Sequence, residues 1–401
     1  MNAPIAISPS APHTPSERTG AIDALRSFLT VLVVLLHSVM AYTTWAQLDK
    51  ENYAHGSTSP VVDPIRWVGF DLVPALLNSF FMAQMFFISG LFVWKSLARK
   101  GSAGFLGDRF KRLGIPWMLT TAFVMPVAFY PSYLMVGGTA SPAAYWLGWS
   151  WTSGPGWFLT MLLAFNAAAA LLFIALGKSP RQNPGWASAV FERPWVFLLT
   201  LTAVSTACLL PMLYIFGPFW WISCGPVIVT QAARPLLYAA YFLGGIAAGV
   251  HGVERGILAS EGPLARRWLL WIVAALVGYV VFLAAVKGLQ TDPAQPWIPA
   301  SAGWLQFGMA SAVCCALCNL ALLAVFLRFV RGTHPFMKSL SASAFGIYLL
   351  HYPAVTWLQF GLLNQPLSAP LKATLVFLGA LALSWALTAA GSAILRPRRS
   401  P

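Results

Sequence analysis

The sequence predicts an all-α, polytopic membrane protein with about ten transmembrane helices and with its N- and C-termini in the cytoplasm. Of its 401 residues, 58% are hydrophobic and only 9% are charged, whereas soluble domains carry about 25% charged residues. Apolar segments of about 20 residues, the length that crosses a bilayer as a helix, recur along the whole chain. The 18 Trp and 27 Phe residues fit a protein with aromatic belts at its membrane faces.

Ten segments are predicted as transmembrane helices from their length and apolar character. They are residues 22–45, 70–97, 114–133, 155–177, 194–216, 234–252, 268–288, 302–328, 341–362 and 370–394. The second contains Asn78 and Gln84, and the fifth is interrupted by Pro211, so these two carry the weakest signal. No intervening stretch is long enough for a soluble domain, and residues 18–395 are therefore expected to form a single transmembrane domain.

Basic residues set the expected orientation. With the N-terminus in the cytoplasm, 20 of the 25 Lys and Arg residues fall on the cytoplasmic side, as the positive-inside rule requires. Residues 1–17 are rich in Pro, Ser and Ala and lack an apolar core, which predicts a disordered cytoplasmic tail rather than a signal peptide. Residues 396–401 are expected to be a basic cytoplasmic tail.

Several functional classes are disfavoured by composition and spacing. The net charge of +14 does not indicate a nucleic-acid-binding protein, because the basic residues cluster in short segments between spans. Cys314, Cys315 and Cys318 share one apolar span and are expected to be packing residues. No spacing of His, Asp and Glu predicts a metal centre, and the absence of an internal repeat disfavours many transporter folds.

The first predicted span carries an unusual polar face. His37 lies in the run Val31–Met40, where an ionisable side chain is costly and indicates a functional site. Arg26 precedes it by eleven residues, which is about three helical turns, so both side chains share a face roughly 16 Å apart along the axis. Asp23 can pair with Arg26 across one turn. The alternatives are that Arg26 extends to the membrane surface and that His37 is a helix-contact residue.

A second group follows the second predicted span. Phe86-Phe87-Ile88-Ser89-Gly90 allows close backbone approach at Ser89 and Gly90. A basic stretch then contains Arg109 and Arg112, which share a face if they are helical. Guanidinium groups bind phosphate in a bidentate manner, so this face suits a polyanionic ligand. Anchoring by the positive-inside rule alone is the alternative.

Two further motifs contain candidate binding residues. Gly154-Pro155-Gly156-Trp157 opens the fourth span, and Trp157 is expected either to stack on a sugar or to belong to the aromatic belt. His351 places a second imidazole inside a span, just before Pro353, which leaves backbone groups without helical partners. It is equally expected as a structural residue. The Gly-, Pro- and Trp-rich stretches 134–154 and 217–233 are expected to re-enter the membrane or line a cavity.

Taken in this order, the motifs resemble the acyltransferase-3 family of integral membrane acyltransferases. The resemblance rests on the Arg26-to-His37 spacing, the Phe86–Gly90 stretch, the Arg109 and Arg112 pair, Trp157-Phe158-Leu159 and Tyr348-Leu349-Leu350-His351. It covers about residues 18–362. The stretches Arg109–Pro116 and Tyr348–Pro353 are most similar to the glucans biosynthesis protein C branch, which is thought to succinylate periplasmic glucans.

The resemblance implies a multi-pass protein of the bacterial inner membrane that moves an acyl group outward. The donor would be acyl-CoA, with an acetyl or succinyl group, and no cofactor would be permanently bound. The acceptor would be a hydroxyl of an envelope carbohydrate, a periplasmic glucan or a glycolipid. The chain lacks an appended extracytoplasmic hydrolase-like domain, so the membrane part or a partner would have to complete the transfer.

The resemblance also implies roles for particular residues. They are, for catalysis, His37, Arg26 and Asp23; for holding acyl-CoA, Arg109, Arg112 and Ser89; and for the acceptor, Trp157 and His351.

Two chemical routes remain open for His37. It can take the proton of the acceptor hydroxyl as a general base, or it can be acylated first and relay the group. A glycan or lipid flippase that uses buried His and Arg side chains as a proton relay is the alternative function.

Overall fold

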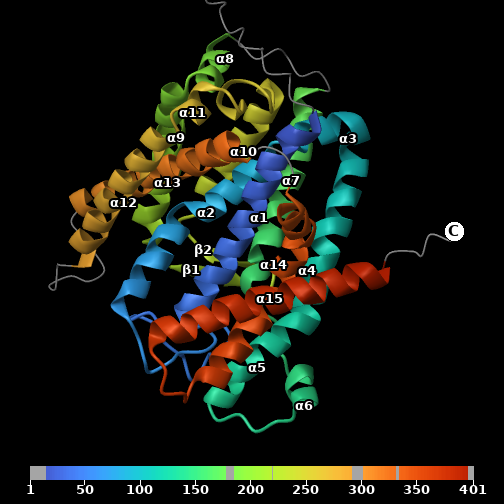
Figure 1. Ribbon diagram of the computed structural model, residues 1–401, viewed down its shortest axis with the longest axis vertical. Helices are drawn as coiled ribbons and strands as arrows, with labels where there is room; N and C mark the ends of the chain where they lie inside the picture. Colours follow the sequence, from blue (N-terminus) through green and yellow to red (C-terminus); the bar gives the residue numbers. More distant parts are fainter. Residues whose placement is uncertain (1–14, 178–184, 219, 291–300, 331–333, 396–401) are drawn as a thin grey trace, which may run out of the picture.

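The computed structural model describes residues 15–177, 185–218, 220–290, 301–330 and 334–395 (Figure 1). These residues form a bundle of α-helices with one small hairpin. The helices are α1 (Pro15–Met40), α2 (Leu72–Gly90), α3 (Val93–Arg109), α4 (Ile115–Leu119), α5 (Met125–Met135), α6 (Pro142–Leu147), α7 (Trp157–Leu176), α8 (Gly185–Glu192), α9 (Pro194–Phe216), α10 (Pro235–His251), α11 (Pro263–Arg266), α12 (Trp268–Gln290), α13 (Ser301–Phe329), α14 (Pro335–Leu362) and α15 (Ala369–Leu395). Of the expected tails 1–17 and 396–401, residues 1–14 and 396–401 lie outside the described residues, whereas residues 15–17 belong to α1, so the prediction of a disordered tail is wrong at these three positions.

Eight helical segments of the described chain are long and apolar enough to cross a membrane. They are Gly20–Met40, Val68–Gly90, Val93–Met135, Gly154–Leu176, Pro194–Phe216, Trp268–Leu289, Gly303–Phe329 and Ala369–Ile394. The other two predicted spans are helical as well. Helix α10 is apolar but only 17 residues long, and α14 has 28 residues that include Lys338 and His351. The fold class is therefore that of an all-α polytopic membrane protein.

Helix α1 occupies the centre of the bundle (Figure 1). It packs against α2, α13, α14 and α15. Leu25, Leu29 and Val34 on this helix are completely buried, whereas Val31, Leu32 and Leu35 are partly exposed. Neighbouring helices therefore cover much of α1, which is the setting in which intramembrane ionisable residues are tolerated.

The segment from α3 to α5 is a single, irregular helical rod. Gly101 interrupts α3 with φ 68° and ψ 167°, a conformation that is accessible to glycine and strained for other residues. Two π-helical turns, η2 (Phe110–Gly114) and η3 (Thr120–Val124), each end just before a proline. Pro116 and Pro126 have no N–H and their rings displace the carbonyl four residues earlier, which accounts for the widened turns.

Helices α2 and α10 approach each other at backbone distance. A Cβ atom placed on Gly90 would lie 2.2 Å from the carbonyl oxygen of Phe242, and one placed on Gly245 would lie 2.0 Å from that of Phe87. Only glycine fits at both positions, as at other close contacts between membrane helices. The predicted role of Gly90 in close backbone approach is confirmed.

The segments predicted between spans adopt ordered structure. Residues 221–231 form an antiparallel hairpin of β1 (Trp221–Cys224) and β2 (Ile228–Gln231), in which Trp221 pairs with Gln231. Short 3₁₀ turns also precede α2 and α7 and lie between α10 and α11; they are η1 (Val68–Asp71), η4 (Gly154–Gly156) and η5 (Gly256–Leu258). Within the stretch 217–233, residues 221–231 are thus a hairpin, and Trp220 and Trp221 at its start are largely exposed.

A buried ion pair fastens the segment between α1 and α2 to the start of α15. Lys372 donates to Asp63 Oδ2 over 2.7 Å and to the carbonyl oxygen of Leu363 over 3.2 Å. The side chains of Lys372 and Asp63 are 0% and 1% exposed. The backbone N–H of Asp63 also donates to the carbonyl of Ala41, just after α1 ends. The pair therefore ties the end of the central helix to α15.

Replacing Lys372 by Met should leave the Asp63 carboxylate buried without its partner. Loss of one member of a buried pair costs about 3–5 kcal/mol, so the melting temperature in detergent should fall markedly. Lys50→Met, at an exposed lysine of the same connecting segment, is the matched control and should melt like the wild type. Equal melting temperatures for the two variants would contradict a stabilising role for the pair.

Candidate active site

Helix α1 carries both halves of the predicted polar face. Arg26 donates to Asp23 over 2.9 Å, which confirms the predicted pairing across one turn. Ser27 donates to the backbone carbonyl of Asp23 and to the hydroxyl of Ser341 on α14. Eleven residues after Arg26, His37 lies close to the end of the same helix, and its side chain is partly accessible. The two predicted groups are thus connected by one rigid element.

The structure brings the two predicted intramembrane histidines together. The rings of His37 on α1 and His351 on α14 lie 5.3 Å apart between centroids, at an interplanar angle of 35°. The ring of Tyr352 meets that of His37 edge-on at 4.9 Å. His351 is completely buried, whereas His37 retains accessible surface. The site therefore has one partly accessible ring, that of His37, and one enclosed ring, that of His351.

The hydrogen bonding of His351 determines which of its nitrogens carries a proton. Its Nδ1 lies 2.7 Å from the backbone carbonyl oxygen of Tyr348. A carbonyl oxygen can only accept, so a neutral ring must carry its proton on Nδ1. The Nε2 atom is buried and has no hydrogen-bond partner among the described residues. His351 therefore presents a free lone pair inside the bundle.

Gln359 on α14 fixes the end of α1 that carries His37. Its Nε2 donates to the carbonyl oxygens of His37 and Ser38, over 2.9 Å and 3.3 Å. The last four carbonyl groups of a helix lack partners within the helix, and α1 ends at Met40. Gln359 therefore caps α1 and holds His37 against the helix that carries His351.

Residues 149–156, called the closing segment below, cover this pair just before α7. Of the stretch 134–154, which was expected to re-enter the membrane or line a cavity, only Tyr145, Trp149, Thr152 and Ser153 are buried. Tyr348 donates to the carbonyl oxygen of Pro155. A Cβ on Gly154 would lie 3.4 Å from the Tyr352 ring. Trp149 is buried and donates to the carbonyl of Thr121. Trp151 lies at φ 50°, a strained conformation for a tryptophan that surrounding contacts must maintain.

The predicted phosphate-binding arginines lie close to the start of the α1 polar face. Arg109 is near enough to Arg112 and Arg26 for their charges to repel one another, and its guanidinium lies 4.9 Å from the centre of the Phe105 ring. Asp108 pairs with Lys100 and Asp23 with Arg26. Arg109 thus lies within range of the positive charges of both Arg112 and Arg26, and these three arginines are called the basic cluster below. Since like charges at short range repel, an anion would stabilise this arrangement.

Two other predicted residues lie elsewhere. Ser89 is partly buried one residue before the end of α2, and no contact in the described chain joins it to the arginines. Trp157 begins α7 and stacks on Tyr238 of α10, with centroids 6.0 Å apart. It is two residues from Pro155, so it adjoins the closing segment without a ring contact to either histidine in the described part of the chain.

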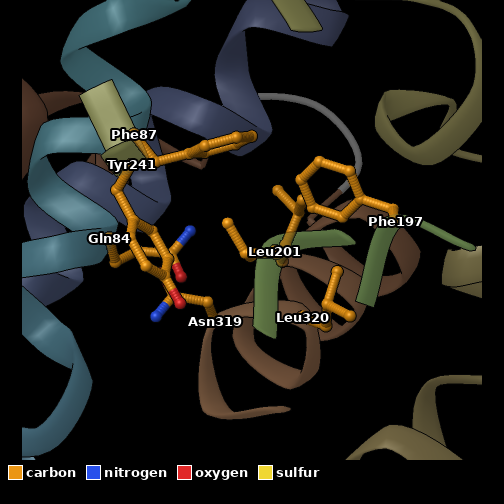
Figure 2. Close-up of a pocket in the computed structure, with 8 residues that line it drawn as sticks. Gln84, Phe87, Phe197, Leu201, Tyr241, Asn319 and Leu320 are labelled. Carbon is orange, nitrogen blue, oxygen red and sulfur yellow. The ribbon is translucent and has the colours of Figure 1, made fainter. Parts of the chain in front are cut away.

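A small cavity lies away from the histidines, between α2, α9, α10 and α13 (Figure 2). Gln84, Tyr241 and Asn319 point their polar ends towards one another there, beside Phe87 and apolar side chains of the other helices. The amide oxygens of Gln84 and Asn319 and the hydroxyl of Tyr241 have no hydrogen-bond partner in the described structure. The cavity volume of about 10 Å³ is close to what one water molecule needs.

Sequence reasoning did not assign two residues of this site. Tyr352 follows His351 directly, and its contact with His37 required knowledge of how α14 is placed against α1. Gln359 lies eight residues after His351, about two helical turns, and so falls on the same face of α14. A buried glutamine on the face of an intramembrane histidine is a signal that could have indicated it.

Two adjoining imidazoles, one of them joined by helix α1 to an arginine cluster, lie within an all-α, multi-pass membrane bundle. The family model of the acyltransferase domain, acyltransferase-3, matches residues 19–389. The chain belongs to this family and is a membrane acyltransferase. Comparisons with curated proteins and with solved structures find no match.

Replacing Gln359 by Leu should leave the carbonyls of His37 and Ser38 without a donor. An unsatisfied buried group costs about 1–3 kcal/mol, so the melting temperature should fall and acyl transfer should slow as His37 loses its fixed position. Gln365→Leu, at an exposed glutamine just after α14, is the control. A Gln359→Leu protein that melts and turns over like this control would refute the capping role.

Proposed function

We propose that the protein transfers an acyl group from acyl-CoA to a hydroxyl of a carbohydrate, with His37 as the group that meets the acyl carbon. The observation that carries this proposal is the course of α1. One helix leads from Arg26, beside Arg109 and Arg112, to a partly accessible imidazole inside the bundle. Along this helix the two groups are roughly 16 Å apart, a distance suited to a long donor whose phosphates and thioester lie far apart.

The basic cluster is proposed to hold the phosphate groups of CoA. Arg109 and Arg112 present guanidinium groups that can bind phosphate oxygens in pairs, and the mutual repulsion of the arginines is relieved when a polyanion binds. Arg26, held by Asp23, would mark where the pantetheine chain leaves the cluster and follows α1 towards His37. The positive-inside rule places this end in the cytoplasm, where acyl-CoA is available.

The imidazole of His37 is suited to the chemistry at the other end. A sugar hydroxyl is a weak nucleophile, so its reaction with a thioester needs either a general base or a more reactive acyl intermediate. His37 has accessible surface and a ring contact with a second imidazole, which supports either role. A flippase would move its substrate without consuming a thioester, so consumption of acyl-CoA distinguishes the acyltransferase from the flippase.

The acceptor is proposed to be an envelope carbohydrate, such as a periplasmic glucan or a glycolipid in the bacterial inner membrane. Tyr352 provides an aromatic ring beside His37, and Trp157, which stacks on Tyr238 next to the closing segment, provides a second aromatic face. Acetyl and succinyl are the proposed acyl groups. In the acceptor-free protein, the closing segment would keep water away from the acyl carbon.

Purified wild-type protein should release free CoA from acetyl- or succinyl-CoA when a glucan acceptor is supplied, and the acylated glucan should appear in equal amount. His37→Ala should abolish both signals, since the group that meets the acyl carbon is lost. CoA can be followed by a thiol reagent and the glucan by mass spectrometry. Turnover by His37→Ala at the wild-type rate would refute the role of His37.

Arg109→Ala should raise the KM for acyl-CoA about tenfold while changing kcat little, because phosphate contacts are present in both ground and transition states. Such a loss corresponds to about 1.4 kcal/mol of binding free energy. Arg193→Ala, at an exposed arginine before α9, removes the same charge outside the basic cluster and should leave KM unchanged. Identical KM values for the two variants would show that Arg109 only anchors the orientation of the spans and does not bind acyl-CoA.

A further inference from the structure

We propose that His351 is a second catalytic residue, whose Nε2 carries the proton of the acceptor hydroxyl to His37 after His37 has been acylated. The inference rests on the proposed acyl transfer and extends it, because it decides between the two routes left open for His37. The inference assigns His37 as the acyl carrier and His351 as the base. It is carried by the hydrogen bonding, burial and ring contact of these two side chains.

The fixed tautomer of His351 prepares it to accept a proton. The bond from Nδ1 to the Tyr348 carbonyl oxygen, 2.7 Å long, leaves the lone pair on Nε2, and a base needs that lone pair free. Nε2 is buried and has no partner in the described structure. A buried polar atom without a partner is costly, and the proton of an acceptor hydroxyl would give Nε2 the partner that it lacks.

His37 is suited to the complementary role. Its side chain keeps accessible surface and lies on the helix that leads from the basic cluster, so the thioester reaches His37 before His351. His351 is fully enclosed behind Tyr348, Tyr352 and His37, whose rings lie 5.3–6.0 Å from its own. An enclosed ring is poorly placed to become a bulky acyl carrier. Its Nε2 can still take a proton from an acceptor hydroxyl that has reached the acyl carbon on the neighbouring His37, and can then pass that proton to His37.

The reaction balances in two steps. A ring nitrogen of neutral His37 attacks the thioester carbon, the C–S bond breaks, and the CoA thiolate leaves with the proton released from the acylated ring. The acceptor hydroxyl oxygen then attacks the same carbon while its proton passes to His351 Nε2. The C–N bond breaks and its electron pair returns to His37, which takes the proton from His351. Both imidazoles end neutral, and the acyl ester and CoA are the products.

The contact between the rings explains why the second base is a histidine on α14. A proton accepted by Nε2 must be returned to the His37 nitrogen that loses the acyl group, so the two rings have to be neighbours. Gln359 holds α1 against α14 at this level, and the Tyr348 carbonyl stabilises the protonated ring by accepting from Nδ1. The Gln359 bonds keep the two rings adjacent for the return of the proton to His37, and the Tyr348 bond stabilises His351 while it carries the proton.

The test separates acylation from transfer with His351→Asn. The Asn amide can still donate to the Tyr348 carbonyl but offers no basic nitrogen. With radiolabelled acyl-CoA and no acceptor, this variant should gain a hydroxylamine-sensitive label on His37, located by mass spectrometry, and release about one CoA per chain. With glucan present, transfer should fall at least 100-fold, within the range typical of a lost general base.

Two control variants test whether the effects are specific to His351 and His37. His334→Asn, at an exposed histidine, should behave like the wild type, and the double variant with His37→Ala should gain no label. Transfer by His351→Asn within threefold of the wild type, or failure of the folded variant to become acylated, would overturn the assignment. Wild-type turnover without any acyl-His37 would also overturn it while leaving the acyltransferase function intact. No CoA release by the wild type would refute that function instead.

A further measurement does not depend on a variant that folds. The decay of acyl-His37 in wild-type protein, started by adding glucan, should be slower in D2O than in H2O because a proton moves in that step. Equal decay rates in the two solvents would overturn the role of His351 as a base.

Discussion

The contact between α1 and α14 is the constraint on which the rest of the site depends. Two imidazoles and a tyrosine ring meet there inside a membrane protein, where unpaired polar groups are costly. Hydrogen bonds between the backbone and side chains offset part of this cost. The Tyr348 carbonyl accepts from His351, and Gln359 supplies the donors missing at the end of α1. These bonds hold the rings of His37 and His351 in contact.

Elements away from the histidines also hold α1 and α14 in position. The buried pair of Lys372 and Asp63 anchors the chain that leaves α1 to the start of α15, and α15 packs against both α1 and α14. On the other side, glycines let α2 lie at backbone distance from α10, which brings α2 and α13 close around α1. The closing segment then covers the histidines through Pro155 and Gly154.

Much of this arrangement was predictable because it follows from local rules. Hydropathy located the helices, since a span must be apolar over its whole length, and helical periodicity placed Asp23, Arg26 and His37 on one face. The pairing of α1 with α14 was not predictable, because the 313 residues between His37 and His351 contain no local signal of it. The π-turns before Pro116 and Pro126 and the hairpin at 221–231 were also missed, since each depends on packing rather than on composition.

The account's central claim is that α1 connects a phosphate-binding cluster to a reactive imidazole. An experimental structure of the protein with a non-hydrolysable thioether analogue of acyl-CoA tests it most directly. The claim predicts phosphate density at Arg109 and Arg112, a pantetheine chain along α1, and the acyl end beside the ring of His37. Phosphates bound away from both arginines, or an acyl end lying among lipid-facing side chains, would contradict it.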